Sequence, residues 1–325
     1  MLETMIRKAL LILLLCCLTG PVATSRGVVA NERREVAITF DDLPVASMLQ
    51  DDKSWKEITR KLLNSITTNK LPVIGFVNET KLYTDNRLDP DRVSLLKAWL
   101  DAGLELGNHT FSHPSLNSTP LAEFESDLLR GEEVTRGLMS ERGKTLRYFR
   151  HPFLHTGRTI ETRDQFESFL RAHGYTVAPV TIDNSDWIFA RAYENARAAN
   201  DARARQRVAA AYVPYIRSKF IYFESESRKL FGRNIKQILL LHANSINADH
   251  FGEIVAMLRS RRYKFVTLGN ALTDKAYAST DTFTGPGGIS WLDRWALTRK
   301  VPPGFFRMEP RTPAFVMKLA GVETE

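Results

Sequence analysis

The residue types best suited to catalysis or metal binding gather in NHTFSHPS, residues 108–115. This stretch places His109 and His113 four positions apart in a chain with only seven histidines. Two imidazoles at i and i+4 project from one side of a helical turn and can share a metal ion. On its own, such spacing more often belongs to two surface or packing histidines, so a metal site needs a further ligand elsewhere in the chain.

A candidate third ligand lies in the pair Asp41-Asp42, which ends the run AITFDD. Two histidines and one carboxylate leave coordination positions open for water and substrate. Because adjacent residues at the end of an extended strand point in opposite directions, one aspartate can bind the metal while the other faces the substrate. A strand-end Asp pair is more often a helix cap or turn. The matching strand-end position of the histidines favours the metal site.

Short apolar runs alternate with longer amphipathic stretches and must position these residues. Such alternation predicts βαβ units around a parallel sheet, and nearly all-apolar runs such as ILLL indicate strands covered on both faces. The predicted strands span residues 35–40, 72–77, 104–109, 146–153, 176–182, 237–242 and 264–268. The predicted helices span residues 55–67, 91–102, 120–138, 159–173, 190–231 and 250–261.

Ionisable groups lie at the ends of five predicted strands. Besides the Asp pair and the two histidines, Arg150 lies late in the fourth run, Asp183 and Asp186 follow the fifth, and His242 ends the sixth. In a barrel of parallel strands, the C-terminal strand ends meet on one face, where the active site is built. An open doubly wound sheet would use fewer strand ends. We therefore predict an α/β barrel.

Composition and charge are those of a soluble globular protein, with 43% hydrophobic and 25% charged residues. The formal net charge of +8 is moderately basic. The basic residues are spread along the chain, apart from an Arg-dotted stretch at residues 191–207, and no nucleic-acid-binding motif accompanies them. Nucleic acid is therefore not an expected partner.

The first 30 residues have the features of a secretion signal. Two basic residues precede an apolar stretch at residues 9–18, and small residues ending at Ala30 offer a cleavage site. The apolar stretch is shorter than the roughly 20 residues that a membrane helix needs. We expect a cleaved signal peptide, a secreted or periplasmic protein and no stable membrane span, with an uncleaved anchor as the alternative. Cys16 and Cys17 lie in this segment, so no disulfide is expected in the mature chain.

The remaining chain divides into a barrel and two additions. The barrel is expected over residues 31–278, with a helical insertion at residues 188–235 whose charges suggest a solvated face. Residues 279–325 are rich in glycine, proline and aromatics. We expect them to form a C-terminal extension packed on the barrel.

Five short motifs identify a family resemblance. TFDD, HTFSH, RHPF, DNSDW and LLLHAN occur in the order and approximate spacing of the five motifs of polysaccharide deacetylases. The chain resembles this NodB-homology group, carbohydrate esterase family 4, over residues 39–244. The resemblance implies a distorted, TIM-like (β/α)7 barrel.

By position, the resemblance implies a role for each matched residue of the first three motifs. Asp42, His109 and His113 would bind a divalent metal ion, with Zn²⁺ the default and Co²⁺ or Ni²⁺ feasible. Asp41 would be the general base that takes a proton from a metal-activated water. Arg150 would pair with Asp41 and keep it ionised.

The last two motifs would supply the acid and part of the substrate groove. His242 would be the general acid that protonates the leaving amine, with Asp186 orienting its imidazole. The substrate-binding residues would be Pro152 and Phe153 in one wall, Trp187 in the other, and Leu240 beneath the acetyl methyl.

The resemblance therefore implies a metal-dependent hydrolase that removes N-acetyl groups from an N-acetylated glycan of the chitin or peptidoglycan type. An O-acetyl esterase acting on xylan or another envelope polysaccharide is the close alternative, because the same attack serves esters. A non-catalytic glycan-binding relative is a third. One departure from the family pattern is Leu43, where the family usually has glycine. It would alter the turn beside the base.

Overall fold

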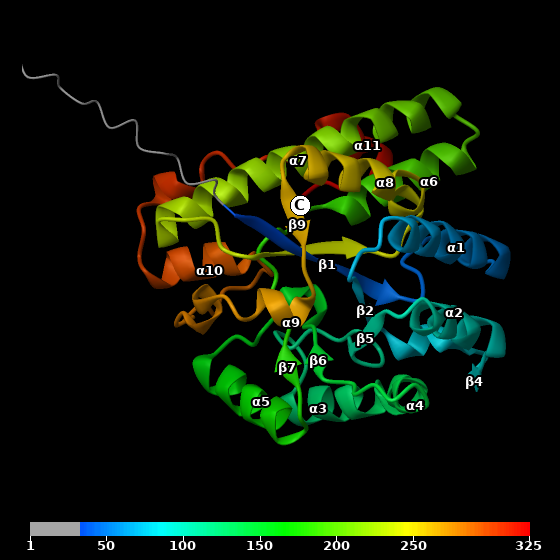
Figure 1. The fold of residues 1–325 in the computed structure, drawn as a ribbon, viewed down its shortest axis with the longest axis horizontal. Helices are drawn as coiled ribbons and strands as arrows, with labels where there is room; N and C mark the ends of the chain where they lie inside the picture. Colours follow the sequence, from blue (N-terminus) through cyan, green and yellow to red (C-terminus); the bar gives the residue numbers. More distant parts are fainter. Residues whose placement is uncertain (1–32) are drawn as a thin grey trace, which may run out of the picture. The chain divides into compact units, whose positions relative to one another are not determined.

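The computed structural model describes residues 33–325, so the predicted signal peptide lies outside the described residues. A curved parallel sheet occupies the middle of this part of the chain (Figure 1). Its strand order is β7-β6-β5-β2-β1-β8, and β9 also pairs with β1. The strands are β1 (Arg34–Leu43), β2 (Ile74–Val77), β5 (Glu105–Asn108), β6 (Tyr148–Phe149), β7 (Thr176–Val177), β8 (Gln237–His242) and β9 (Tyr263–Phe265).

Helices follow most strands and cover the sheet. Several begin at a side chain that accepts a hydrogen bond from the first helical turn, as Asp51, Asp89 and Thr159 do. The α-helices are α1 (Asp52–Thr68), α2 (Pro90–Asp101), α3 (Leu121–Arg130), α4 (Glu133–Ser140), α5 (Ile160–Ala172), α6 (Asp186–Ala198), α7 (Ala202–Phe231), α8 (Ser245–Ser260), α9 (Leu268–Ala271), α10 (Trp291–Thr298) and α11 (Ala314–Ala320).

Residues 176–182 join the two ends of the sheet. At their start they pair with β6, and the Ala178 amide donates to the Phe149 carbonyl at 2.8 Å. Further along, Ile182 forms a parallel bridge with Leu239 in β8, and the Leu240 amide donates to the Ile182 carbonyl at 3.2 Å. One segment therefore serves both neighbours and closes the sheet into a barrel.

The barrel is distorted because β1 serves three neighbours. Along one edge it pairs with β8 from Val36 to Asp41. Its other edge pairs first with β9, through Arg34–Val36, and then with β2, beginning at Thr39. Since β9 and β2 share one edge of β1, β9 lies at the N-terminal end of the barrel, away from the C-terminal strand ends.

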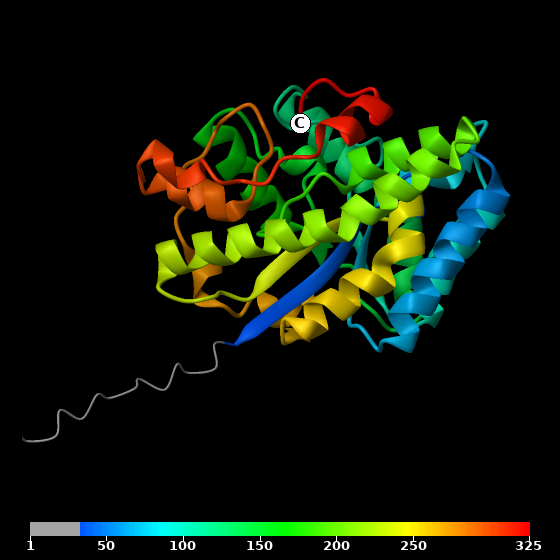
Figure 2. The same ribbon diagram turned by 90° about the horizontal axis from the view of Figure 1, so that it is seen from above.

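Residues in the predicted insertion form α6 and the 30-residue α7, which pack on each other and on α8. Figures 1 and 2 show α7 alongside β1 and β8. The C-terminal residues form two short helices: α10 contacts α7, and α11 contacts α6. Among residues 33–325, no helix combines the length and hydrophobicity needed to cross a bilayer.

Several predicted elements differ from the structure. The predicted helix 190–231 is two helices, α6 and α7, and the predicted strand 176–182 is a strand only at Thr176–Val177. The fourth predicted strand, 146–153, is paired only at Tyr148–Phe149, because η2 (Pro152–Leu154) begins soon afterwards. The predicted helix 120–138 is two helices, α3 and α4, separated at Gly131. A Cβ at Gly131 would lie 2.3 Å from the Thr110 carbonyl carbon. Glycine at 131 thus lets the helix pair approach the backbone of the 109–113 loop.

Candidate active site

The loop that follows β5 carries both histidines of HTFSH. Asn108 ends the strand, and its side-chain oxygen accepts a hydrogen bond from the Thr110 amide at 2.7 Å. The Thr110 hydroxyl in turn accepts one from the His113 amide at 3.0 Å. Thr110 and His113 both have left-handed backbone conformations, with φ of 66° and 59°. The side-chain bonds hold this compact loop in shape.

The premise that His109 and His113 lie on a helical turn is therefore wrong. Their loop contains no helix, and the left-handed residues bring the rings together instead. The ring centroids are 4.8 Å apart. The spacing correctly predicted that the two rings are neighbours. A loop with left-handed residues, and not a helical turn, places them together.

The Asp41-Asp42 pair also departs from simple strand alternation. Asp42 has a φ of 65°, and the register between β1 and β2 shifts between Phe40 and Leu43. This bulge turns both carboxylates toward the same histidine. An oxygen of Asp41 lies 3.9 Å from His109 Nε2, and an oxygen of Asp42 lies 3.7 Å from the same nitrogen.

Asp42, His109 and His113 form a cluster suited to a metal ion, with one ligand atom from each within 4.8 Å of the others. Asp42 Oδ1 is 3.5 Å from His113 Nε2, is buried, and has no hydrogen-bond partner. His109 Nδ1 lies 2.8 Å from the Arg150 carbonyl and donates to it, so Nε2 keeps its lone pair toward the cluster. The donor set fits a divalent cation.

Lys81, from η1 (Glu79–Leu82), contacts the outer side of Asp42. Its Nζ lies 3.4 Å from Asp42 Oδ2 and donates to the carbonyl oxygens of Asp42 and Val45. Burial opposes ionisation of Asp42, but Lys81 and the two histidines hold the pKa of this carboxyl below its usual value. Asp42 is therefore present as the carboxylate that metal binding requires.

Asp41 is buried beside Arg150. Arg150 Nη1 lies 3.3 Å from Asp41 Oδ2, while Nε donates to the Ala178 carbonyl and Nη2 to the Thr39 hydroxyl. Burial raises the pKa of Asp41 to about 6, and Arg150 limits that rise. Asp41 Oδ1 has no hydrogen-bond partner. A carboxylate held on one oxygen and free on the other is suited to accept a proton.

His242 ends β8 and pairs with Asp186, the first residue of α6. His242 Nδ1 lies 2.7 Å from Asp186 Oδ1 and donates to it, and the His242 amide donates to Oδ2. Oδ2 also accepts from the side-chain amides of Asn244 and Asn247. Burial lowers the pKa of His242, but the Asp186 carboxylate outweighs it and raises the pKa to about 9. His242 is thus a proton donor at neutral pH.

Both aspartates of the Asp41-Asp42 pair, the two loop histidines and His242 line one cavity of about 360 Å³. Leu240 lies in its wall, and the two most exposed lining aromatics are Phe153 and Trp187, with 55% and 44% of their surface exposed. Phe153 also packs against His113, with ring centroids 4.4 Å apart. Pro152, by contrast, is buried within η2 and does not line the cavity.

The cavity has further lining residues to which the sequence analysis assigned no role. His151, Leu154, Asp183, Asn184 and Gly288 also face the cavity. Only the position of Asp183 after a strand was a signal. The residues that support Asp186 from outside the motifs were also missed. Asn247 in α8 donates to Asp186, and Tyr212 in α7 donates to Asn247 at 2.6 Å.

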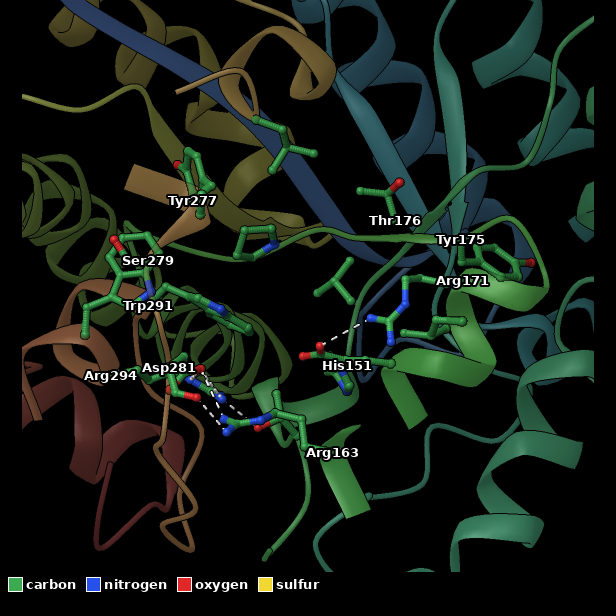
Figure 3. A pocket seen from close by; sticks show the side chains of 18 of the residues that line it. His151, Arg163, Arg171, Tyr175, Thr176, Tyr277, Ser279, Asp281, Trp291 and Arg294 are labelled. Atoms are coloured by element: carbon green, nitrogen blue, oxygen red, sulfur yellow. Dashed lines mark hydrogen bonds and ion pairs between the residues drawn. The ribbon is translucent and has the colours of Figure 1, made fainter. Parts of the chain in front are cut away.

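A larger cavity of about 660 Å³ lies elsewhere, between α5, residues 176–179 and the C-terminal residues (Figure 3). It shares His151 with the smaller cavity but contains none of the predicted metal-binding or proton-transfer residues. The residues suited to metal binding and proton transfer therefore lie at the smaller cavity.

Comparison with known proteins agrees with this arrangement. The family model described as polysaccharide deacetylase matches residues 29–178, which include the Asp pair, both loop histidines and Arg150. Over these residues the chain is similar to the polysaccharide deacetylase family. The predicted resemblance is therefore confirmed.

Two curated proteins are similar to this chain. The chain is 24% identical over 242 residues to a chitin deacetylase of Colletotrichum lindemuthianum, covering 74% of this chain and 79% of that protein. It is 24% identical over 155 residues to a peptidoglycan-N-acetylglucosamine deacetylase of Bacillus cereus. That match covers 48% of this chain and spans 47% of the relative's own length.

Among solved structures, the chain is similar to a mutant of a Bacillus anthracis family 4 carbohydrate esterase pseudoenzyme with restored enzymatic activity. The TM-score is 0.50 at 16% identity, covering 74% of this chain and 68% of the other. A likeness at this identity concerns the fold alone. With the strand pairing above, it confirms the predicted distorted (β/α)7 barrel.

Proposed function

We propose that this protein is a metal-dependent hydrolase that removes acetyl groups from the nitrogen of an N-acetylated glycan. The observation that carries the proposal is one cavity that brings together a metal-ligand cluster, a buried carboxylate and a carboxylate-paired histidine. The match to the polysaccharide deacetylase family model supports an acetylated polysaccharide as the substrate class. The names of the chitin and peptidoglycan relatives support the N-acetyl form.

Asp42, His109 and His113 would hold a divalent cation, with Zn²⁺ as our first choice for this ligand set. When bound, such an ion lowers the pKa of a coordinated water and polarises a carbonyl group. The protein supplies the order around it. The Arg150 carbonyl fixes His109, the Thr110 hydroxyl fixes the His113 backbone, and Lys81 holds the outer oxygen of Asp42.

Asp41 would accept the proton of the attacking water. Its pKa of about 6 leaves it ionised at neutral pH yet basic enough to take a proton. Arg150 orients it through Oδ2, so the unpartnered Oδ1 is the oxygen available for this task. Attack on the acetyl carbon breaks the carbonyl π bond and gives a tetrahedral intermediate.

His242 would donate the proton that the leaving nitrogen needs. Its Nδ1 is committed to Asp186, so Nε2 is the donor atom. Proton transfer lets the carbon–nitrogen bond break, releasing acetate and an amino sugar. Leu240 would contact the acetyl methyl, and Phe153 and Trp187 would contact the sugar rings.

A specific test measures acetate release from N-acetylglucosamine oligomers by metal-reconstituted protein, with and without a chelator. We expect release that the chelator abolishes, and a loss of release in His113→Ala. His173→Ala is the matched control, because His173 is an exposed histidine at the C-terminal end of α5 with no role in the proposed mechanism. Activity that survives both chelation and His113→Ala would refute the metal-dependent mechanism.

An O-acetyl esterase uses the same groups, so acetylated xylan belongs in the same assay series. Faster acetate release from xylan than from the N-acetylglucosamine oligomers would replace the N-deacetylase proposal with the esterase. A non-catalytic role would show as glycan binding without acetate release from any of these substrates. The assembled Asp41–Arg150 and His242–Asp186 pairs argue against it.

We also propose that the protein acts outside the cytoplasm. The support is the basic and apolar pattern of residues 1–30. Cell fractionation, with N-terminal sequencing of the processed chain, tests it. Cytoplasmic protein that retains residues 1–30 would contradict the proposal.

A further inference from the structure

The C-terminal residues reach the proposed active site. Gly288 lines the same cavity as the metal cluster and His242. It belongs to residues 284–290, here called the wall segment, which precedes α10. No motif of the family covers these residues, and Gly288 lies far along the chain from the other lining groups.

The wall segment touches the loop that carries Phe153. A Cβ built on Gly288 would lie 1.7 Å from the Phe153 carbonyl oxygen and 3.0 Å from the Leu154 Cβ. No sugar ring fits between surfaces this close. Phe153 and Leu154 themselves have left-handed backbone conformations, so this loop turns sharply where the wall segment meets it.

Both ends of the wall segment are bonded to the barrel. The Asn117 side-chain amide donates to the Pro286 carbonyl at 3.0 Å, and its oxygen accepts from the Gly157 amide. At the other end, the Ser290 hydroxyl donates to the Thr181 carbonyl, and the following backbone amide, of Trp291, donates to the Val180 carbonyl at 2.7 Å. The segment thus spans from Asn117, in the loop after β5, to residues 180–181, which follow β7.

An ion cluster next to the larger cavity anchors the residues on either side of the wall segment (Figure 3). Arg294 Nη2 lies 2.7 Å from Asp281 Oδ2, and Arg163 Nη1 lies 3.4 Å from the same oxygen. Arg163 also donates to the carbonyls of Asp281 and Phe283. Arg294 and Arg163 are both buried, so screening by solvent is weak. The wall segment is therefore a fixed surface.

We infer that the wall segment closes one side of the substrate cleft, so that this protein deacetylates a sugar at one terminus of a glycan chain. The inference rests on the proposed deacetylase function. A glycan that crossed the cavity would have to continue past Phe153. The wall segment contacts the Phe153 backbone there and blocks this path. The reacting sugar must then be the last unit in that direction.

The test maps the products of N-acetylglucosamine pentamer labelled at its reducing end. Mass-spectrometric sequencing after one acetyl loss locates the free amine. We expect wild-type protein to release acetate from one terminal position in nearly all products. It should also act faster, per acetyl group, on the pentamer than on long chitin chains, because a polymer offers few ends.

Two variants weaken the wall. Asn117→Ala removes the bond to Pro286, and Gly288→Ala forces the segment away from the Phe153 carbonyl. Each should increase the share of internal deacetylation several-fold. Asn64→Ala, on the exposed face of α1, is the control and should keep the wild-type pattern.

The outcomes separate the two proposals. Acetate release spread evenly along the pentamer in wild-type protein overturns terminal specificity and leaves the deacetylase intact. An unchanged terminal pattern in both Asn117→Ala and Gly288→Ala, with both variants folded by circular dichroism, shows that another feature sets the specificity and also overturns the inference. No release from any acetylated glycan overturns the proposed function, and the inference with it.

Discussion

At the scale of single residues, the His242–Asp186 pair and Asp41 define a pH window for the proposed reaction. Asp41 must be ionised to accept a proton, so the rate should fall as pH drops below about 6. His242 must be protonated to donate one, so the rate should fall as pH rises above about 9. We expect a bell-shaped profile of kcat/KM between these values, measured by acetate release. A rate that keeps rising beyond pH 10 would contradict the assigned acid.

Asp186→Asn tests the cause of the alkaline limb. Removing the carboxylate leaves burial as the main influence on His242, and burial lowers its pKa. The alkaline limb should therefore move to lower pH while the acid limb stays. His242→Ala should remove the alkaline limb and reduce kcat by about 10²- to 10⁴-fold, the usual contribution of a positioned acid. If Asp186 had only a structural role, Asp186→Asn would lower the stability of the fold and leave the alkaline limb at the same pH.

His151 gives a prediction about stability. It is fully buried, and burial, followed by the Arg294 charge, lowers its pKa to about 3 from an ordinary value of 6.5. The unfolded chain therefore takes up a proton below pH 6.5 that the folded chain refuses, and stability falls with falling pH. Between pH 6.5 and pH 5 the loss amounts to about 2 kcal/mol.

The measurement is urea denaturation of wild-type protein and His151→Phe at pH 7 and pH 5. Phenylalanine keeps an aromatic ring near Phe149 and Phe166, whose centroids lie 4.9 and 5.4 Å from the histidine ring. The variant should lose less stability between the two pH values, because the other titrating groups are common to both proteins. Equal losses would show that His151 is protonated in the fold.

At the scale of elements, Gly131 brings α3 and α4 close to the loop that carries His109 and His113. A Cβ at position 131 would lie 2.3–2.4 Å from backbone atoms of Thr110 and Phe111. Backbone atoms cannot move away as easily as a flexible side chain. Gly131→Ala should destabilise the fold by about 1–3 kcal/mol. Thermal denaturation measures it, and calorimetric Zn²⁺ titration should show weaker binding because the loop shifts.

Gly137 provides the matched control within the same helix pair. It lies inside α4, and a Cβ there would meet nothing within 4 Å. Gly137→Ala should therefore stabilise the protein by up to about 1 kcal/mol through helix propensity. If both alanine variants behave alike, close approach at Gly131 is not what separates α3 from α4.

Sequence patterns predicted elements well where they are long and local. The bounds of β8 agree with the prediction of residues 237–242, and α1, α2 and α5 agree within a few residues. The strands of residues 146–153 and 176–182 were predicted too long, because their pairing depends on how the barrel curves. Residues 120–138 carry a continuous helical pattern, and only the tertiary contact at Gly131 interrupts it.

For the site, motif order placed the metal cluster, the Asp41–Arg150 pair and the His242–Asp186 pair at one cavity. Local patterns could not supply the left-handed backbone of Asp42 and His113, since neither is glycine. Nor could they supply Gly288, whose position depends on how the whole C-terminal extension packs. Side chains fixed by backbone periodicity were predictable, and those placed by distant segments were not.

At the scale of the whole molecule, metal binding should be coupled to stability. The ligands come from β1 and from the loop after β5, so an ion held by all three stabilises the folded state relative to the unfolded one. At a metal concentration 100 times Kd, the gain is about 2.7 kcal/mol. Chelation should therefore lower Tm by several degrees in wild-type protein and leave the Tm of His113→Ala unchanged. An equal drop in both would place the stabilising ion elsewhere.

The contact between α11 and α6 carries a consequence for biosynthesis. Asp186 begins α6, and that helix is bonded to residues 314–325: the Asn195 side-chain amide donates to the Leu319 carbonyl, and the Ser185 hydroxyl donates to the Glu325 carboxylate. A ribosome releases residues 314–325 long after Asp186 has emerged. The contacts that hold this end of α6 can therefore form only after residues 314–325 have also been synthesised.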